Sequence, residues 1–460
     1  MQSKQAIKKQ IIDDISQMIF SGILKRGDFL PSIRIMSDRY NVSRGTVLVV
    51  YKTLESLGYI QGHERSGYLV ISAPEGRDPQ PQIGKTAEKQ PPHSEKKPPV
   101  TAAYQSLERH NRTQLPKHFI RRWCLGSSSP QLQTGWNRWE VSDKRLKNSL
   151  CRFILISRGI SLLPENMVLS SGMQEALLLI GASVASTRQQ PTILVEDPCP
   201  LHVRELFRSL NFRVLPIAVD QQGICVADFP AAGADLIFTS PARQFPMGVS
   251  LSDSRRHTLY EWACRHNALI IENDCFAMLG FGQSVTPALR HQYPDPHIIY
   301  LTHLAELTGS GINVCCIAAS PQFIQLIRQF IPLLTSDTNP LTSALLSSFL
   351  DSPHFMKYLT GRLQARQQKL ALAQEGIQQR WPGMDYDGSE NSGFLTFHTG
   401  IRQLPEGLIN RYFFPVDIFR LVPQEKRQAR AGIIYPFDLL SFAEIEKINL
   451  QLQDASDVCY

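Results

Sequence analysis

The sequence lacks any apolar run long enough to cross a membrane, which takes about 18 to 20 residues. Its first residues, Met1 to Gln5, are polar and no apolar stretch follows them, so we expect no signal peptide. None of the nine cysteines forms a CxxC pair, and only Cys315 and Cys316 are adjacent. This usage predicts reduced thiols in a cytoplasmic protein, with neither a disulfide framework nor a metal site.

Lysine is missing from a long central stretch. There is no lysine between Lys147 and Lys357. Chemistry that needs a lysine amine as its covalent nucleophile is therefore excluded from this stretch. The sequence also shows no internal repeat, which excludes a solenoid or propeller built from short units.

Positive charge is concentrated at the N-terminal end. The formal net charge is +7, and residues 1–72 carry ten basic and six acidic side chains, a surplus of four. A basic segment joined to a nearly neutral body is typical of a DNA-binding unit attached to another domain. We therefore expect double-stranded DNA as a partner, and a nucleoid-associated protein.

Composition changes sharply after Ser72. Residues 74–99 hold paired prolines, charges and glutamines with almost no large apolar side chain. Such a stretch cannot bury enough surface to offset its ordering entropy. We predict a domain over residues 1–72, a proline-rich linker over 73–117 and a large domain over 118–460.

The large domain alternates helical and strand-like segments. Residues 174–184 have helical character, and short apolar runs at 192–196, 213–217, 236–239, 269–271 and 298–301 read as buried strands. This alternation indicates an α/β domain with a mostly parallel sheet covered by helices on both faces. From about Pro321 the pattern is more helical and mixed, which favours a smaller second lobe.

The first domain reads as a winged helix-turn-helix. Residues 7–19 repeat isoleucine and methionine at helical spacing. A turn over 27–32 places Ser32 as the N-cap of a second helix over 33–40. Ser43 is the expected N-cap of a third helix, which ends near Gly58. Two short helices across a tight turn define the motif, and residues 59–61 and 68–70 predict a hairpin wing.

The third helix suits a major groove of DNA. Arg44 can donate two hydrogen bonds to a guanine, and Gly45 allows close backbone approach. The hydroxyls of Ser43 and Thr46 and the first amides of this helix can bind phosphate oxygens. Lys52, later on the same helix, is expected to contact phosphate only. The predicted DNA-binding residues are Arg34, Ser43, Arg44, Gly45, Thr46, Lys52, Arg65 and Gly67.

Several motifs in this domain resemble the GntR family of winged helix regulators. They are Leu-Pro-Ser-Ile-Arg at 30–34, Val-Ser-Arg-Gly-Thr-Val at 42–47, Tyr-Lys-Thr-Leu at 51–54, Gly-Tyr-Ile at 58–60 and Arg-Ser-Gly-Tyr at 65–68. The resemblance covers nearly all of residues 4–72. It implies DNA contacts at Arg34, Arg44, Thr46 and Gly67.

Segments of the large domain resemble the aminotransferase fold of pyridoxal-phosphate enzymes, fold type I. They are residues 171–177, 195–199, 240–248, 271–274 and 300–301. The resemblance covers most of residues 118–460 and is weak after about Ser320. A GntR-type domain joined by a long linker to an aminotransferase-like domain resembles the MocR subfamily. This resemblance implies that the large domain forms a dimer.

This sequence departs from the MocR pattern where the cofactor would bind. The pattern places the lysine of the Schiff base a few residues after residues 300–301, where Glu306 stands. Asn273 replaces the aspartate against the pyridine nitrogen, and Pro200, Cys275 and Asn313 replace a stacking aromatic, a tyrosine and a phosphate-side arginine. We therefore predict no catalytic residues and no pyridoxal phosphate.

A remnant pocket remains a candidate ligand site. Its backbone amides could hold an anion at a strand-to-helix turn, and arginines could hold a carboxylate. The residues concerned are Ser171, Gly172, Met173, Arg243, Asn273, Glu306 and Arg430, of which Arg430 matches the substrate-carboxylate position of the family. The alternative is that they are ordinary turn residues and surface ion pairs, and that Glu272 and Asp274 cap strand ends.

Three functions are compatible with these observations. The first is a DNA-binding transcription regulator whose aminotransferase-like domain dimerises and senses a small molecule without catalysis. The second is a pyridoxal-phosphate-binding MocR-type regulator or an active aminotransferase. In the third, the large domain only binds a protein partner. The missing lysine favours the first or third over the second.

Overall fold

The computed structural model describes residues 4–20, 24, 26–40, 42–63, 67–71, 115–117, 119–121, 139–275, 286–308, 312–333, 340–387, 393–397, 404, 406–409, 411–420 and 432–454. Two compact units divide the chain, Met1–Ser94 and Glu95–Tyr460. The predicted linker lies almost wholly outside the described residues. Leu115 is buried in a core of the second unit, so this unit begins before the predicted boundary at residue 118.

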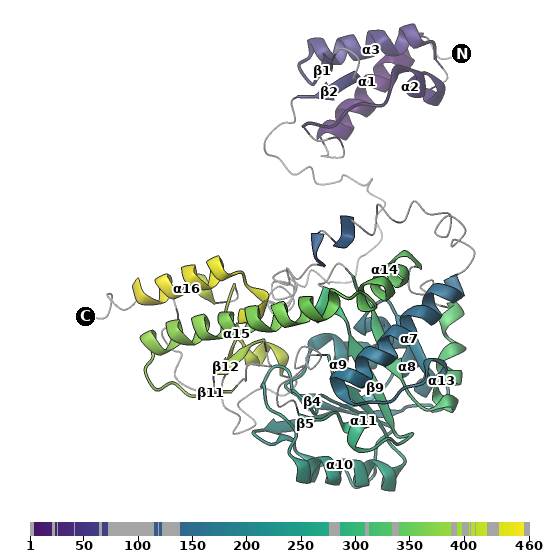
Figure 1. Ribbon diagram of the computed structural model, residues 1–460. Helices are drawn as coiled ribbons and strands as arrows, with labels where there is room; N and C mark the ends of the chain where they lie inside the picture. The colour runs from purple at the N-terminus through teal and green to yellow at the C-terminus, as the bar shows by residue number, and fades with distance from the viewer. Residues whose placement is uncertain are drawn as a thin grey trace, which may run out of the picture. The chain divides into compact units, whose positions relative to one another are not determined.

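The described part of the first unit has three helices and a hairpin (Figure 1): α1 (Lys4–Phe20), α2 (Ile33–Tyr40), α3 (Arg44–Ser56), β1 (Ile60–His63) and β2 (Gly67–Val70). Apolar side chains from all of these elements share one core, among them Ile15, Met36 and Tyr51. The Tyr51 hydroxyl donates to the Pro31 carbonyl at 2.6 Å, which ties α3 to the turn before α2. The predicted helix-turn-helix and wing are confirmed.

The second unit is built on an eight-stranded sheet in the order β3-β10-β9-β8-β7-β4-β5-β6. The strands are β3 (Met167–Ser170), β4 (Thr192–Asp197), β5 (Arg213–Asp220), β6 (Gly223–Ile224), β7 (Leu236–Thr239), β8 (Leu269–Asn273), β9 (Ile298–His303) and β10 (Cys315–Ala318). The inner pairs from β5 to β9 are parallel, whereas β10 is antiparallel to both of its neighbours. The expected mostly parallel sheet is therefore present.

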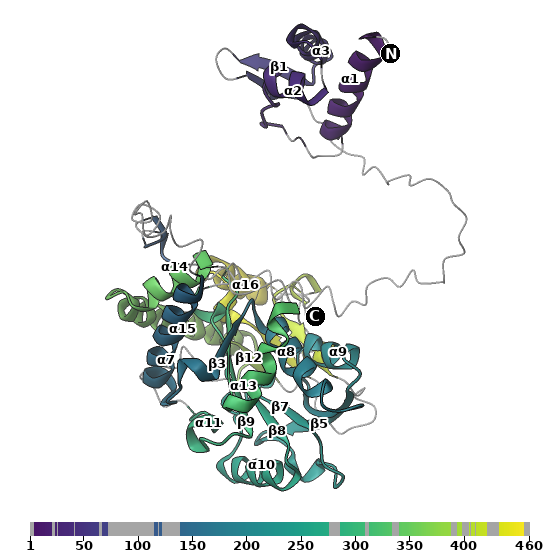
Figure 2. The ribbon, with the colours of Figure 1, turned by 90° about the vertical axis from the view of Figure 1, so that its right-hand side faces the viewer.

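Helices cover both faces of this sheet (Figure 2). On one face lie α8 (Met173–Ala185), α9 (Leu201–Ser209) and α13 (Pro321–Arg328). On the other lie α7 (Trp139–Arg158), α10 (Asp253–His266) and α14 (Pro340–Leu350). Alternate residues of each strand supply the two cores, as in Ile299 and Tyr300, because successive side chains of a strand point to opposite faces.

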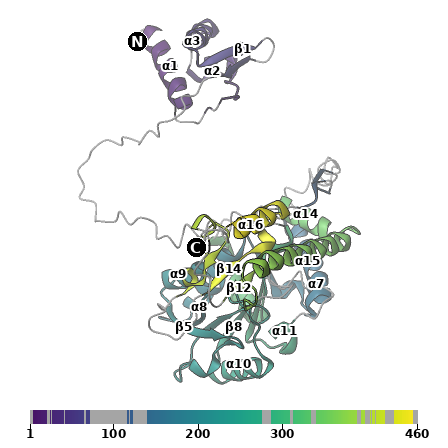
Figure 3. The ribbon, with the colours of Figure 1, turned by 90° about the vertical axis from the view of Figure 1, so that its left-hand side faces the viewer.

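A smaller lobe follows, as the mixed pattern after Pro321 predicts (Figure 3). A long helix, α15 (Phe355–Arg380), packs beside α16 (Phe442–Asp454). An antiparallel sheet in the order β11-β12-β14-β13 contains β11 (Tyr386–Asp387), β12 (Leu395–Phe397), β13 (Phe414–Pro415) and β14 (Ile433–Tyr435). These elements bury their own aromatic core, which includes Phe397, Phe413 and Tyr435.

Short helical turns complete the second unit. They are α11 (Leu289–Gln292), α12 (Ala305–Thr308) and 3₁₀ turns at Pro164–Asn166, Val226–Asp228, Ile331–Leu333, Glu406–Leu408, Val416–Phe419 and Phe437–Leu439. In the described part of the chain, no helix combines the length and the apolar character that a membrane span requires.

Candidate functional site

The first unit carries a surface groove at the start of α3. Its volume is about 730 Å³, and it is lined by Leu30, Pro31, Ser32, Ile33, Arg34, Arg44, Gly45, Leu48, Tyr51, Gly67 and Tyr68. The loop before α2, the first turns of α3 and the wing thus share one surface. Arg34 and Arg44 are both exposed, and neither forms an ion pair with a described residue. Two unpaired cations beside a groove suit a polyanion such as DNA.

Ser43 determines where α3 begins. The amide of Thr46 donates to Ser43 Oγ at 3.3 Å, and the two hydroxyl oxygens lie 2.9 Å apart. This is the predicted N-cap, and it places Arg44 and Gly45 in the exposed first turn of the helix. Because Ser43 and Thr46 are already bonded to each other, their contacts with phosphate stay a prediction.

The wing is attached to α3 by a charged hydrogen bond. The Gly62 amide donates to Glu55 Oε1 at 2.7 Å. Gly67 pairs with His63 across the hairpin and has a φ of +102°, a conformation that favours glycine. Lys52 is exposed further along α3, and Arg65 lies outside the described residues. The structure thus brings Arg34, Arg44, Gly45 and Gly67 to one groove.

The candidate pocket of the large domain lies at the carboxyl edge of the main sheet. Cys315, at the start of β10, pairs with Ser170 on one side and His303 on the other. The ends of β3, β8 and β9 therefore meet at the same edge, where ligands bind in open α/β sheets. Ser171, Asn273 and His303 are placed there by backbone topology.

Two side chains of this chain bind the turn where the anion cradle is predicted. The Ser171 amide donates to the Glu175 carboxylate at 2.5 Å, and the Asn313 amide nitrogen donates to the Ser171 carbonyl at 3.0 Å. Gly172 has a φ of +114°, and a Cβ there would lie 2.3 Å from Asn313 Nδ2. The Glu175 carboxylate thus takes up the Ser171 amide, one of the backbone donors that a phosphate at this turn would need.

Asn273 ends β8 with a neutral amide. It is 7% exposed, and its Nδ2 donates to Ser240 Oγ at 3.1 Å. Its Oδ1 is buried and has no hydrogen-bond partner among the described residues. An amide oxygen cannot supply the negative charge that would keep a pyridine nitrogen protonated.

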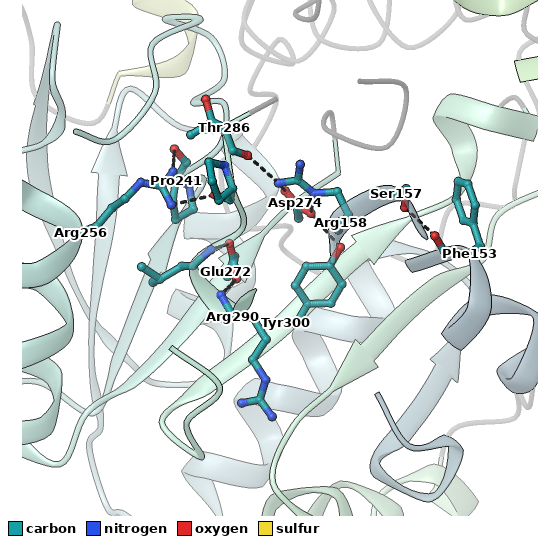
Figure 4. Close-up of polar contacts among 12 residues, drawn as sticks. Phe153, Ser157, Arg158, Pro241, Arg256, Glu272, Asp274, Thr286, Arg290 and Tyr300 are labelled. Atoms are coloured by element: carbon teal, nitrogen blue, oxygen red, sulfur yellow. Dashed lines mark hydrogen bonds and ion pairs between the residues drawn. The ribbon is translucent and has the colours of Figure 1, made fainter. Parts of the chain in front are cut away.

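The neighbouring acids are engaged elsewhere (Figure 4). Asp274 accepts from Arg158 Nε at 2.6 Å and from the Tyr300 hydroxyl at 2.7 Å, and this ion pair is almost fully buried. Burial beside this carboxylate holds the pKa of Tyr300 well above its usual value. The expectation that Asp274 caps a strand end is wrong, because α7 supplies a buried arginine as its partner.

Glu272 caps the start of a helix, and not the end of a strand as expected. Its carboxylate accepts from the backbone amides of Leu289, at 2.5 Å, and Arg290, at 2.7 Å (Figure 4). These are the first amides of α11. Burial raises the pKa of Glu272 to about 7. Its bonds make it a structural acid that links β8 to α11.

Two histidines at the same edge were missed by sequence reasoning. His303 Nε2 donates to Asn313 Oδ1 at 2.5 Å, which extends the bonded chain from His303 through Asn313 to Ser171. Burial, and then repulsion from His303, lower the pKa of His202 to about 4. Burial also lowers the pKa of His303. Both shifts favour the neutral imidazole. The only sequence signal for His303 was its place at the polar end of an apolar strand, and His202, in the first turn of α9, had no such signal.

The remaining predicted pocket residues are only partly placed. Arg243 is buried, at 7% exposure, in the turn after β7, so the expectation of a surface ion pair does not hold for it. Met173 begins α8, and Pro200 is the N-cap of α9. Glu306 lies in α12, but its side chain is outside the described residues, as is all of Arg430.

One group of three potential metal ligands occurs in the described chain: Cys264, Asp295 and His297. It lies beside the amino ends of β8 and β9, at the edge opposite the candidate pocket. Asp295 is already bonded to His297 Nδ1 at 2.7 Å and to the Tyr260 hydroxyl at 2.8 Å. Hydrogen bonding within the group accounts for this arrangement.

The described residues do not fit pyridoxal phosphate. Glu175 takes up the Ser171 amide of the predicted cradle, Asn273 is a neutral amide and Asp274 is paired with Arg158. Beyond the central stretch without lysine, the Lys369 amine donates to the Asp438 carbonyl at 2.7 Å, and Lys357 is exposed on α15. The arrangement can support packing and neutral hydrogen bonding, but it lacks the groups for Schiff-base chemistry.

These features define a class of protein: a winged helix-turn-helix DNA-binding unit joined to an aminotransferase-fold domain. Residues 7–70 match the family described as bacterial regulatory proteins, gntR family. The second unit is similar to an archaeal alanine:glyoxylate aminotransferase, with a TM-score of 0.62 at 18% identity over 77% of this chain and 95% of that one. The fold expected from the sequence is thereby confirmed.

Similarity to regulators extends over most of the chain. This chain is 23% identical over 393 residues to the probable rhizopine catabolism regulatory protein MocR of Rhizobium meliloti, and the match covers 79% of this chain and 76% of that protein. This chain is also 27% identical over 384 residues to the vitamin B6 salvage pathway transcriptional repressor PtsJ of Salmonella typhimurium. That match covers 80% of this chain and 81% of the repressor. The chain thus has the MocR-like arrangement of a GntR-type DNA-binding domain and an aminotransferase-fold domain.

Proposed function

We propose that this chain is a sequence-specific DNA-binding regulator of transcription. One observation carries the proposal: the groove at the start of α3 brings exposed Arg34 and Arg44 together with the wing glycine Gly67. In a winged helix, the first turn of such a helix reads base edges while the flanking elements contact backbone. The relatives named as regulators support the same assignment.

The large domain is proposed to act without catalysis and without pyridoxal phosphate. The support is the bonded chain of His303, Asn313 and Ser171, together with the missing lysine and the neutral Asn273. Its proposed roles are dimerisation and response to a small molecule of another kind. A homodimer would present two winged helices to two DNA half-sites.

The test is selection of bound sequences from a random pool of duplex DNA by the full chain. The proposal expects enrichment of one motif that contains a guanine, and loss of this preference in Arg44→Ala. Val49→Ala, which alters a neighbouring exposed residue of α3 outside the groove, is the matched control and should retain the motif. Failure to enrich any sequence would overturn the proposed function.

A further inference from the structure

The cationic groove contains one exposed aliphatic side chain on α3. Leu48 is 37% exposed and lines the groove together with Arg44 and Gly45. It follows Arg44 by four residues, so the two side chains are neighbours on the helix surface. The core-facing side chains of α3 are fully buried; they are Val47, Val50, Tyr51 and Leu54. Leu48 is therefore not required to complete the core.

An aliphatic side chain at this position has a specific use on DNA. Phosphates and most base edges offer it only charged or polar groups, whereas the major-groove edge of thymine carries a 5-methyl group. Burying a leucine against that methyl removes apolar surface of both partners from water. We propose that Leu48 reads a thymine methyl close to the guanine read by Arg44, within the same half-site. This inference rests on the proposed function and adds a second base to it.

Helix geometry limits where that thymine lies. Four residues of α-helix rise about 6 Å, and one base pair of duplex DNA rises about 3.4 Å. A helix that lies along the groove therefore places Leu48 about two base pairs from the guanine under Arg44. The two side chains together specify a short guanine–thymine element within each half-site.

Val49 provides a matched control on the same helix. It is also aliphatic and exposed, at 47%, but it does not line the groove. Truncation to alanine at either position removes a surface side chain and leaves the buried face of α3 intact. The thermal midpoints of Leu48→Ala and Val49→Ala should therefore match that of the wild-type chain.

The test uses the full chain and the motif obtained by selection. Each thymine near the guanine is replaced in turn by uracil, which removes only the methyl group. At one thymine, wild type and Val49→Ala should lose about fourfold in affinity, the change expected for one buried methyl group. Leu48→Ala should bind the thymine and uracil duplexes equally.

Two results would overturn the assignment while the proposed function stands. One is a wild-type protein that tolerates uracil at every thymine within about three base pairs of the guanine, or a motif with no thymine there. The other is a Leu48→Ala protein that still loses the full amount, about fourfold in affinity, when that thymine is replaced by uracil. If the chain enriches no sequence at all, the proposed function fails and the assignment of Leu48 falls with it.

Discussion

At the scale of single residues, charge and its burial separate the two functional regions. Arg34 and Arg44 of the first unit are exposed and neither forms an ion pair with a described residue, whereas Arg158 of the second unit is buried with its carboxylate partner. An exposed cation can change partners when a ligand arrives, but a buried one cannot leave its partner without a large penalty. The first arrangement suits recognition, and the second suits stability.

Arg44 and Lys52 should respond differently to truncation because they are proposed to contact different parts of DNA. Arg44→Ala should cost about 1–3 kcal/mol on the selected site and much less on random duplex. Lys52→Ala should weaken binding to both duplexes equally. It should also reduce the slope of log affinity against log salt concentration by about one. Fluorescence anisotropy over a range of salt measures both effects. Equal losses for Arg44→Ala on both duplexes would reassign this residue to a phosphate.

Glu196 should make the stability of the large domain depend on pH. This carboxylate is fully buried and accepts from Thr239 Oγ1 at 2.6 Å and from the Ser240 amide at 2.9 Å. Burial raises its pKa to about 7, above that of an unfolded glutamate, so the folded state binds the proton more tightly. The free energy of unfolding should therefore fall as pH rises from about 4.5 to about 7.

The substitution Glu196→Gln tests the contribution of Glu196 to this pH dependence, because glutamine has nearly the same shape but does not titrate. Urea unfolding at several pH values should show that the variant loses less stability over this range, by on the order of 1 to 3 kcal/mol. The pH slope above about pH 8 should be the same in both proteins, since Glu196 is ionised in both states there. An unchanged slope between pH 5 and about 7 in the variant would contradict the assignment.

At the scale of elements, the second unit depends on bonds between distant strands and helices. The Arg158–Asp274 pair joins α7 to the residue that follows β8, and Tyr300 brings β9 into the same cluster (Figure 4). Arg158→Met should lower the free energy of unfolding by about 3–5 kcal/mol, because it leaves a buried carboxylate without its cation. Arg152→Met is the control: this residue is on the same helix and pairs with Asp351 at 2.6 Å, but its side chain is 61% exposed.

The control should cost less than about 1 kcal/mol, since exposed ion pairs contribute little. Denaturant titration of both variants compares them under one condition. Similar losses in the two would mean that the buried pair does not join α7 to the sheet as the geometry indicates.

The sequence predicted these elements better than the contacts between them. Apolar runs such as 192–196 and 298–301 match β4 and β9 closely, because buried parallel strands need such runs. Ser43 marked the start of α3 because capping is a local interaction. Arg158 and Asp274 are 116 residues apart, and Ser171 and Asn313 are 142 apart, so only the strand order brings them together.

At the scale of the whole molecule, the proposal requires two copies. Folds of the aminotransferase kind are expected to pair about a two-fold axis, and paired winged helices match paired half-sites. Sedimentation of the full chain at micromolar concentration should give the mass of two 51.9 kDa chains. A monomer under these conditions would remove the basis for half-site recognition.

We propose that an aminotransferase fold serves a DNA-binding regulator here without its cofactor. The most direct test of this proposal is intact-mass and peptide mass spectrometry after borohydride reduction of the full chain with added pyridoxal phosphate. We predict that no residue of the large domain gains a stable adduct, because residues 148–356 contain no lysine and Lys369 is held by Asp438. A stoichiometric adduct on one residue of that domain, matched by a yellow preparation, would show instead that the domain binds the cofactor covalently.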